Sequence, residues 1–137
     1  MNMLDPQSNP TSNDANLAML IDEAVLTELR ELLGDELQDI VDQFLTSLDE
    51  DLCSLADAVR EPDLDAAARH AHAIKGSAGN LGLNALAACA ADLERLSRGA
   101  DADTAERSFS ALRSTATATL VRLQCMGLAR QTPEAGS

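Results

Sequence analysis

The stretch of sequence that decides the fold is residues 36–60, which read ELQDIVDQFLTSLDEDLCSLADAVR. Its apolar residues recur at steps of three and four, and they are Leu37, Ile40, Val41, Phe44, Leu45, Leu48, Leu52, Leu55, Ala56 and Val59. This period predicts an amphipathic helix with one face in a hydrophobic core. Seven of the other 15 positions are acidic, so we expect the opposite face to be solvated.

Four further helices are predicted on either side of this run. They span about 17–33, Asp63 to about Leu81, Asn84 to Gly99, and Asp103 to Leu123. Short connections between amphipathic helices favour antiparallel neighbours. The predicted fold is therefore all-α, an antiparallel up-and-down four-helix bundle with an additional N-terminal helix. In that helix, Leu26, Leu29 and Leu33 either cover one end of the bundle or contribute to a docking surface.

Short polar residues and glycines predict where these helices begin and end. We expect Gly34 and Gly82 to stop the helices before them, because glycine accepts the left-handed conformation of a C-terminal cap. Asp63 is placed to cap the helix that follows Pro62. Two capping boxes are predicted, and they pair Asp35 with Gln38 and Asp103 with Glu106.

Length and composition indicate one domain. The chain has 137 residues, enough for a single hydrophobic core. Residues 1–16 and 130–137 are polar and lack periodicity, so we expect flexible tails around a helical bundle at residues 17–129. Aromatic residues make up 1% of the chain, and a core of Leu, Ala, Ile and Val suits helices.

The cysteines and the apolar runs bear on the compartment. Cys53, Cys89 and Cys125 are widely spaced within helical patterns, so we expect reduced core thiols rather than a metal site. No apolar run reaches the roughly 18 residues of a membrane span, and the N-terminus lacks the pattern of a signal peptide. These observations predict a soluble, cytoplasmic protein.

Charge is distributed unevenly along the chain. The net charge is −13, and residues 22–65 hold 15 acids and two arginines. Residues 69–98 instead hold four basic residues and two acids. The acidic balance argues against binding to duplex nucleic acid, which needs a basic face. The small positive window suits a phosphate or an acidic pocket of a partner.

The only lysine of the chain lies in this positive window, in the run RHAHAIKGSAGNLG at residues 69–82. On a helix, His72, Lys75, Gly76 and Gly79 share one stripe, away from the apolar face of the same helix. A glycine inside a helix costs about 1 kcal/mol relative to alanine. Either Gly76 ends the helix, or the glycines permit close packing between helices, or they permit close approach by an outside partner. Their place on the His72 stripe favours the partner.

The residue types on this stripe suit phosphoryl transfer. A neutral imidazole is a nucleophile toward phosphorus, and the ammonium of Lys75 can neutralise phosphoryl oxygens. The chain has no P-loop motif, so it could not take a phosphoryl group from ATP unaided. His70 lies about 160° from His72 around the helix, so the two cannot share a metal ion. We expect His70 to lie at the surface or to form a hydrogen bond between helices.

The run from Ala71 to Gly82 resembles the Ala-His-x-Leu-Lys-Gly-Ser signature of the histidine-containing phosphotransfer family. Members of this family are helical bundles that shuttle phosphoryl groups between receiver-domain aspartates in two-component phosphorelays. The similarity extends from about Asp22 to Leu123. It implies a phosphoryl carrier without kinase activity of its own, with response-regulator receiver domains and a hybrid sensor kinase as partners. No cofactor, metal, nucleic acid or membrane is implied, and we expect a monomer.

The resemblance also implies roles for individual residues. His72 becomes the phospho-acceptor, Lys75 the phosphate-stabilising cation, and Gly76 the opening through which a receiver approaches. Ser77, Gly79 and Glu94 become partner-binding candidates. Some members have a glutamine 22 positions after the histidine that helps to orient it; here Glu94 can accept a hydrogen bond from the neutral imidazole but repels a phosphoryl group.

Two other function classes compete with the carrier. An acidic helical scaffold would explain residues 22–65 as a solvated face, with His72 an ordinary surface residue. It leaves the lone lysine and the glycine stripe without an explanation. A hydrolytic or metal enzyme has little support, because two histidines that do not face each other and three dispersed cysteines form neither a triad nor a ligand set.

Overall fold

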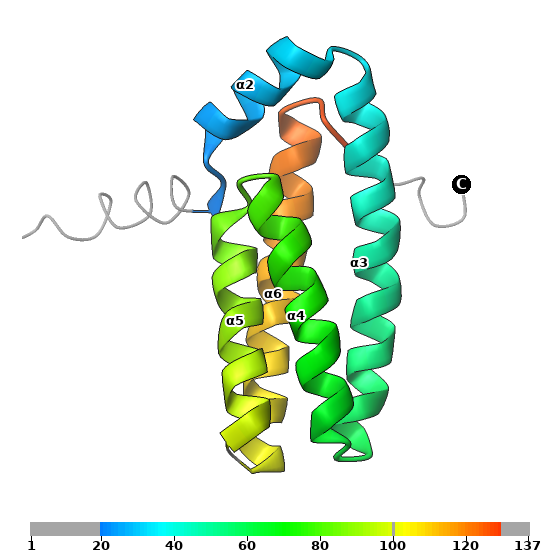
Figure 1. Ribbon diagram of the computed structural model, residues 1–137, viewed down its shortest axis with the longest axis vertical. Helices are drawn as coiled ribbons and strands as arrows, with labels where there is room; N and C mark the ends of the chain where they lie inside the picture. The colour runs from blue at the N-terminus through cyan, green and yellow to red at the C-terminus, as the bar shows by residue number, and fades with distance from the viewer. Residues whose placement is uncertain (1–19, 100, 130–137) are drawn as a thin grey trace, which may run out of the picture.

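The structure, a computed structural model, describes residues 20–99 and 101–129 (Figure 1). In these ranges five helices follow one another, and they are α2 (Glu23–Leu33), α3 (Glu36–Arg60), α4 (Leu64–Asn80), α5 (Asn84–Gly99) and α6 (Ala102–Cys125). The same residues contain no strand, so the predicted all-α fold is confirmed. No helix in this part of the chain has both the length and the apolar character that a membrane crossing requires.

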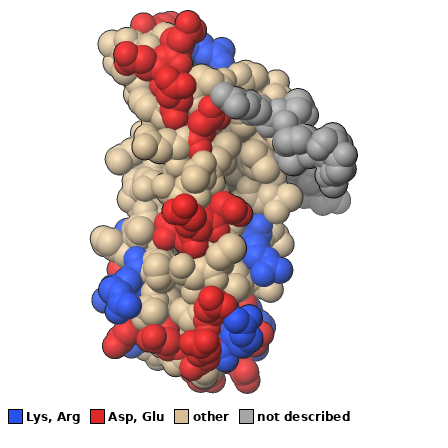
Figure 2. Space-filling model, turned by 90° about the vertical axis from the view of Figure 1, so that its right-hand side faces the viewer, with Lys and Arg blue, Asp and Glu red and all other residues tan. Residues whose placement is uncertain are grey.

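The longest helix, α3, is amphipathic as its sequence predicts. The side chains that it buries are Leu37, Val41, Phe44, Leu48, Leu55, Ala58 and Val59. The exposed acids of the same helix include Glu36, Asp39, Asp49, Glu50 and Asp57. Figure 2 faces the side of the molecule on which α3 lies, and it shows acidic side chains at several levels of this surface. The acidic face of α3 is thus solvated.

Helices α3 to α6 form the four-helix bundle. Each packs against the next in chain order, and α6 packs back against α3, which closes the ring (Figure 1). The connections are only a few residues long, so successive helices run in opposite directions, as predicted. Leucine, alanine and isoleucine make up most of the core, together with the two phenylalanines Phe44 and Phe109.

The remaining helix, α2, lies across one end of the bundle (Figure 1). Leu26 is buried, and Leu29 and Leu33 pack against the core, so these leucines cover the bundle end. The predicted start of this helix is wrong, because α2 begins only at Glu23. Asp22 has an extended backbone, and its carboxylate accepts hydrogen bonds from the N–H groups that follow it. Aspartate is favoured at such a capping position and is less favoured inside a helix. Residues 17–19 lie outside the described residues.

The turn between α4 and α5 holds the start of α2. Gly82 has a φ of 74° and Gly34 a φ of 57°, which confirms both as helix stops. The N–H of Asp22 donates to the carbonyl oxygen of Gly82 at 2.7 Å. A Cβ at position 82 would lie 2.9 Å from Cβ of Val25, so this turn requires glycine for both its backbone conformation and its space.

The predicted capping box at the start of α3 is wrong. Asp35 forms no side-chain cap hydrogen bond. The Gln38 amide instead donates to the carbonyl oxygen of Leu128 at 2.7 Å and to the carboxylate of Asp42 at 3.2 Å. The bond to Leu128 connects α3 to the segment after α6, and Gln38 forms this tertiary contact in place of the capping box with Asp35.

The predicted start of α6 is also wrong, by two residues. Asp101 is the N-cap, and its carboxylate accepts the N–H of Thr104 at 2.9 Å. Asp103 lies in the first turn of the helix, where an acid favours the helix dipole. Glu106 is exposed and is not part of a capping box with Asp103.

The prediction of core cysteines is wrong for Cys53 and Cys125. Cys53 and Cys125 are exposed and Cys89 is half-buried, and all three are free thiols. The Cys89 sulfur lies 3.4 Å from the hydroxyl oxygen of Thr115 on α6. Cys53 and Cys125 lie beside the apolar stripes of their helices, where Leu52, Leu55 and Leu123 supply the packing, whereas Cys89 is partly buried and packs against the core.

Candidate functional site

His72 lies on α4 with its side chain turned away from the core. The helix begins after Asp63, whose carboxylate accepts the N–H of Ala66 at 3.2 Å, as predicted. The residues that α4 buries are Ala67, Ala68, Ala71, Ile74 and Ala78. The His72 side chain is 63% exposed. The bundle thus fixes the backbone of His72 while its imidazole stays accessible.

One ring nitrogen of His72 has a partner on the neighbouring helix. Nδ1 lies 3.1 Å from Oε2 of Glu94 on α5. An ionised carboxylate can only accept hydrogen bonds, so in the neutral imidazole the proton is assigned to Nδ1. The lone pair is then on Nε2, the nitrogen on the other side of the ring. Glu94 therefore selects Nε2 as the nucleophilic atom.

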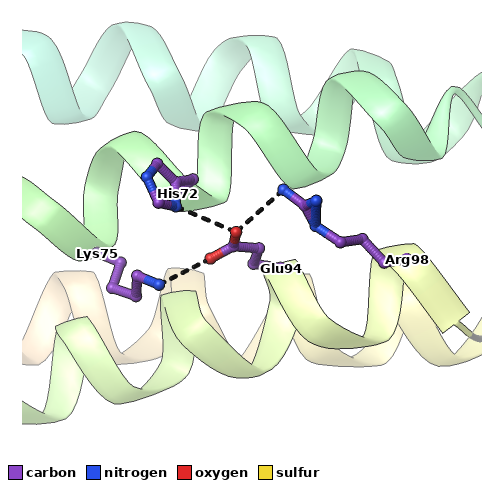
Figure 3. A network of polar contacts seen from close by, with 4 residues as sticks. All are labelled: His72, Lys75, Glu94 and Arg98. Carbon is purple, nitrogen blue, oxygen red and sulfur yellow. Dashed lines mark hydrogen bonds and ion pairs between the residues drawn. The ribbon is translucent and has the colours of Figure 1, made fainter.

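Glu94 joins His72 to two cations (Figure 3). Its Oε1 lies 3.0 Å from Nζ of Lys75, and its Oε2 lies 3.0 Å from a guanidinium nitrogen of Arg98. The Glu94 side chain is 14% exposed, whereas those of Lys75 and Arg98 are 39% and 57% exposed. The carboxylate thus lies beneath three donors that reach the surface.

These donors keep Glu94 ionised. The hydrogen bond from Lys75 is the largest influence, and together with the bond from His72 it lowers the pKa of the Glu94 carboxyl below its ordinary value. Burial acts in the opposite direction but is outweighed. The four side chains hold two permanent cations and one anion, so the site carries one net positive charge when His72 is neutral.

The two glycines of the stripe face open space. Within the part of the chain that the structure describes, a Cβ at Gly76 or at Gly79 would meet nothing within 4 Å. The helix continues through both and ends at Asn80. Of the structural explanations for these glycines, the structure therefore excludes a helix stop at Gly76 and close packing of another helix against either residue.

A groove runs between α3 and α4 beyond the glycines. Its lining residues are Ile40, Gln43, Phe44, Ser47, Ser77, Asn80 and Leu81. Ile40 is 39% exposed, which is unusual for so apolar a side chain. Ser77 lies about 140° around the helix from His72, so it borders this groove and is not next to the imidazole.

The sequence placed most of the candidate residues correctly relative to one another. His72, Lys75 and Glu94 come together, and Gly76 and Gly79 share their face. His70 lies apart from them, and its Nδ1 is 3.2 Å from the carboxylate of Asp51 on α3. This contact confirms His70 as a residue that bonds between helices.

Sequence reasoning missed Arg98 as a member of the site. Its guanidinium donates to the same carboxylate oxygen that contacts His72. The spacing of four residues from Glu94 is that of a favourable helical ion pair, and this pattern could have drawn attention to Arg98.

The arrangement of these side chains suits nucleophilic transfer of a phosphoryl group. An exposed imidazole nitrogen beside a half-exposed ammonium group can take up a phosphoryl group and pass it on. Among the described residues, no group of three or more His, Cys, Asp or Glu side chains is placed to hold a metal ion.

Comparison with known proteins identifies the family. A family model described as "Hpt domain" matches residues 39–122, more than half of the chain. The sensor histidine kinase AruS of Pseudomonas aeruginosa is 42% identical over 81 residues, which are 58% of this chain but only 8% of the kinase. The crystal structure of histidine-containing phosphotransfer protein B (HptB) from Pseudomonas aeruginosa PAO1 aligns with a TM-score of 0.75 and 27% identity, covering 80% of this chain and 95% of that chain.

These matches agree with the helical bundle and with the resemblance of its signature run to phosphotransfer proteins. None of them favours the acidic scaffold. The chain belongs to the Hpt domain family, and its function is histidine phosphotransfer in a phosphorelay.

Proposed function

We propose that His72 is the phospho-acceptor of this domain and that it reacts through Nε2. The observation that carries this assignment is the contact of 3.1 Å between Nδ1 and Glu94, which leaves the Nε2 lone pair free on an exposed ring. Nε2 attacks the phosphorus of a receiver's aspartyl phosphate. The N–P bond forms, the P–O bond to the aspartate breaks, and its electron pair leaves with the carboxylate.

Glu94 and Lys75 take complementary parts in this step. The ring becomes cationic when Nε2 uses its lone pair, and the Glu94 carboxylate stabilises that charge through the proton on Nδ1. Lys75 supplies a positive charge to the phosphoryl oxygens from the next turn of the same helix. The positive charges of the ring and of Lys75 thereby offset the repulsion between Glu94 and the phosphoryl group.

The open face beside His72 receives the partner. Gly76 and Gly79 leave room for the edge of a receiver's active site, since a Cβ added at either position would meet none of the described residues within 4 Å. The groove beyond them, bordered by Ile40 and Ser77, offers an apolar strip for a helix of the receiver. The docking surface thus combines the open space beside His72 with the apolar groove about two helical turns away.

The partners that we propose are receiver domains of response regulators and of a hybrid sensor kinase. The carrier needs no cofactor and has no kinase activity of its own, so its phosphoryl group comes from a receiver aspartate. It acts as a monomer in the cytoplasm, through the helical unit at residues 17–129.

The test is transfer from a phosphorylated receiver domain to the purified chain. We expect an acid-labile, alkali-stable label on wild-type protein and none on His72→Gln. A His70→Gln variant serves as the matched control, because it removes the other histidine of the same helix. Label that persists in His72→Gln would rule out this assignment.

A further inference from the structure

The carboxylate of Glu94 divides its donors between its two oxygens (Figure 3). Oε1 pairs with Lys75 at 3.0 Å. Oε2 pairs with Nδ1 of His72 at 3.1 Å and with Arg98 at 3.0 Å. Lys75 can therefore leave without breaking either bond at Oε2.

Phosphorylation changes what Lys75 has to neutralise, and this step rests on the proposed function. A phosphoryl group on Nε2 adds nearly two negative charges on the exposed side of the ring. Lys75 is 39% exposed and has a flexible four-carbon stem, so it can turn from Oε1 to the phosphoryl oxygens. Glu94 then loses the bond that contributes most to keeping its carboxyl ionised.

We infer that Arg98 is a positioning residue that holds the Glu94 carboxylate against Nδ1 of His72 after Lys75 has moved to the phosphoryl group. Its guanidinium remains charged in both states. Its bond to Glu94 is within α5, four residues apart, so it does not depend on α4. Lys75 and Arg98 thus have separate tasks: one follows the phosphoryl group and the other keeps the acceptor of the ring proton in place.

The retained proton affects the second half of the relay. In onward transfer a carboxylate oxygen of a receiver's aspartate attacks the phosphorus, so that a P–O bond forms, the N–P bond breaks and its electron pair returns to Nε2. A ring that keeps its Nδ1 proton leaves as neutral imidazole, whereas a ring that has lost this proton must leave as an anion, which is a poorer leaving group. Arg98 therefore supports onward transfer by holding Glu94 on the ring proton.

The experiment compares wild type with Arg98→Gln, Arg98→Lys and Arg95→Gln. Arg95 is the matched control, because it is on the same helix and 69% exposed but pairs with Asp92. Phosphoramidate, a small donor that needs no docking surface, phosphorylates each protein. Nitrogen NMR of the His72 ring reports the Nδ1 proton before and after phosphorylation, and mixing with an unphosphorylated receiver domain gives the onward rate.

We expect Arg98→Gln to match wild type before phosphorylation, because Lys75 still holds Glu94. After phosphorylation its Nδ1 proton should exchange faster with water, and onward transfer should slow by roughly two- to five-fold, the range of an exposed ion pair. Arg98→Lys should restore the rate, and Arg95→Gln should match wild type in both states.

Two results overturn the inference alone: phosphorylated Arg98→Gln that matches Arg95→Gln, or a ring-proton change equally large before and after phosphorylation. Failure of wild-type His72 to take the label overturns the proposed function as well. The labelling of wild type therefore distinguishes the two failures.

Discussion

Replacing Gly76 with alanine should stabilise the domain while it impairs its function. The position is inside α4, and a Cβ there would meet nothing within 4 Å among residues 20–99 and 101–129, so we expect the substitution to have no steric cost. Alanine is favoured over glycine in a helix by about 0.5–1 kcal/mol. For a domain of this size that gain corresponds to roughly 2–5 °C in the midpoint of thermal unfolding.

Function should respond in the opposite direction, and more strongly as the side chain grows. Gly76→Gln places a long side chain over the clearing beside His72, so we expect transfer from a phosphorylated receiver to fall about tenfold or more. Uptake from phosphoramidate should change little, because that donor needs no close approach of a protein. Ala118→Gln is the matched control, since Ala118 is exposed on α6, diagonally across the bundle from α4.

Circular dichroism during heating and a receiver transfer assay measure the two effects. A lower unfolding midpoint for Gly76→Ala would mean that the glycine serves packing within the fold. Receiver transfer at the wild-type rate in Gly76→Gln would mean that no partner approaches over this residue. Either result would refute the reasoning.

Three further predictions concern the site and the fold. The bond from Lys75 lowers the pKa of the Glu94 carboxyl, so the bond stabilises the fold above the ordinary pKa of 4.5, and this stabilisation is lost as the pH falls below that value. In urea unfolding, the difference in unfolding free energy between wild type and Glu94→Gln should therefore become smaller in acid. Gly82→Ala should lose about 2–4 kcal/mol of unfolding free energy, because φ is 74° and the new Cβ would lie 2.9 Å from Val25; an unchanged urea midpoint would contradict this. His70→Gln should keep the wild-type rate of phosphoryl uptake, and a loss of label there would extend the site toward Asp51.

The helices were predictable because their determinants are local. The apolar period of α3 and the glycines at positions 34 and 82 act within a few residues of chain. The starts of α2 and α6 were not predicted correctly; at α6 two acids, Asp101 and Asp103, are both possible caps, and the backbone conformation decides between them. The side chain of Gln38 hydrogen-bonds to the carbonyl oxygen of Leu128, which is 90 residues away in sequence and cannot be predicted from a local pattern.

The site divides in the same way. Helical periodicity alone places Lys75 and Gly76 beside His72. The contact with Glu94 spans 22 residues and exists only because α4 packs against α5; the family resemblance pointed to the position and to its hydrogen bond with His72, but not to its ion pairs with Lys75 and Arg98. The ion pair between Glu94 and Lys75 depends on side-chain geometry across the two helices, and the net charge of residues 69–98 did not specify it.

The most direct test of the central claim is the position of the phosphoryl group on the ring. Wild-type protein labelled by a phosphorylated receiver should carry phosphorus on Nε2 of His72, with a proton on Nδ1, as nitrogen and phosphorus NMR of the ring would show. Glu94 contacts Nδ1 at 3.1 Å, which is the reason for this expectation. A phosphoryl group on Nδ1, or on any residue other than His72, would contradict the account.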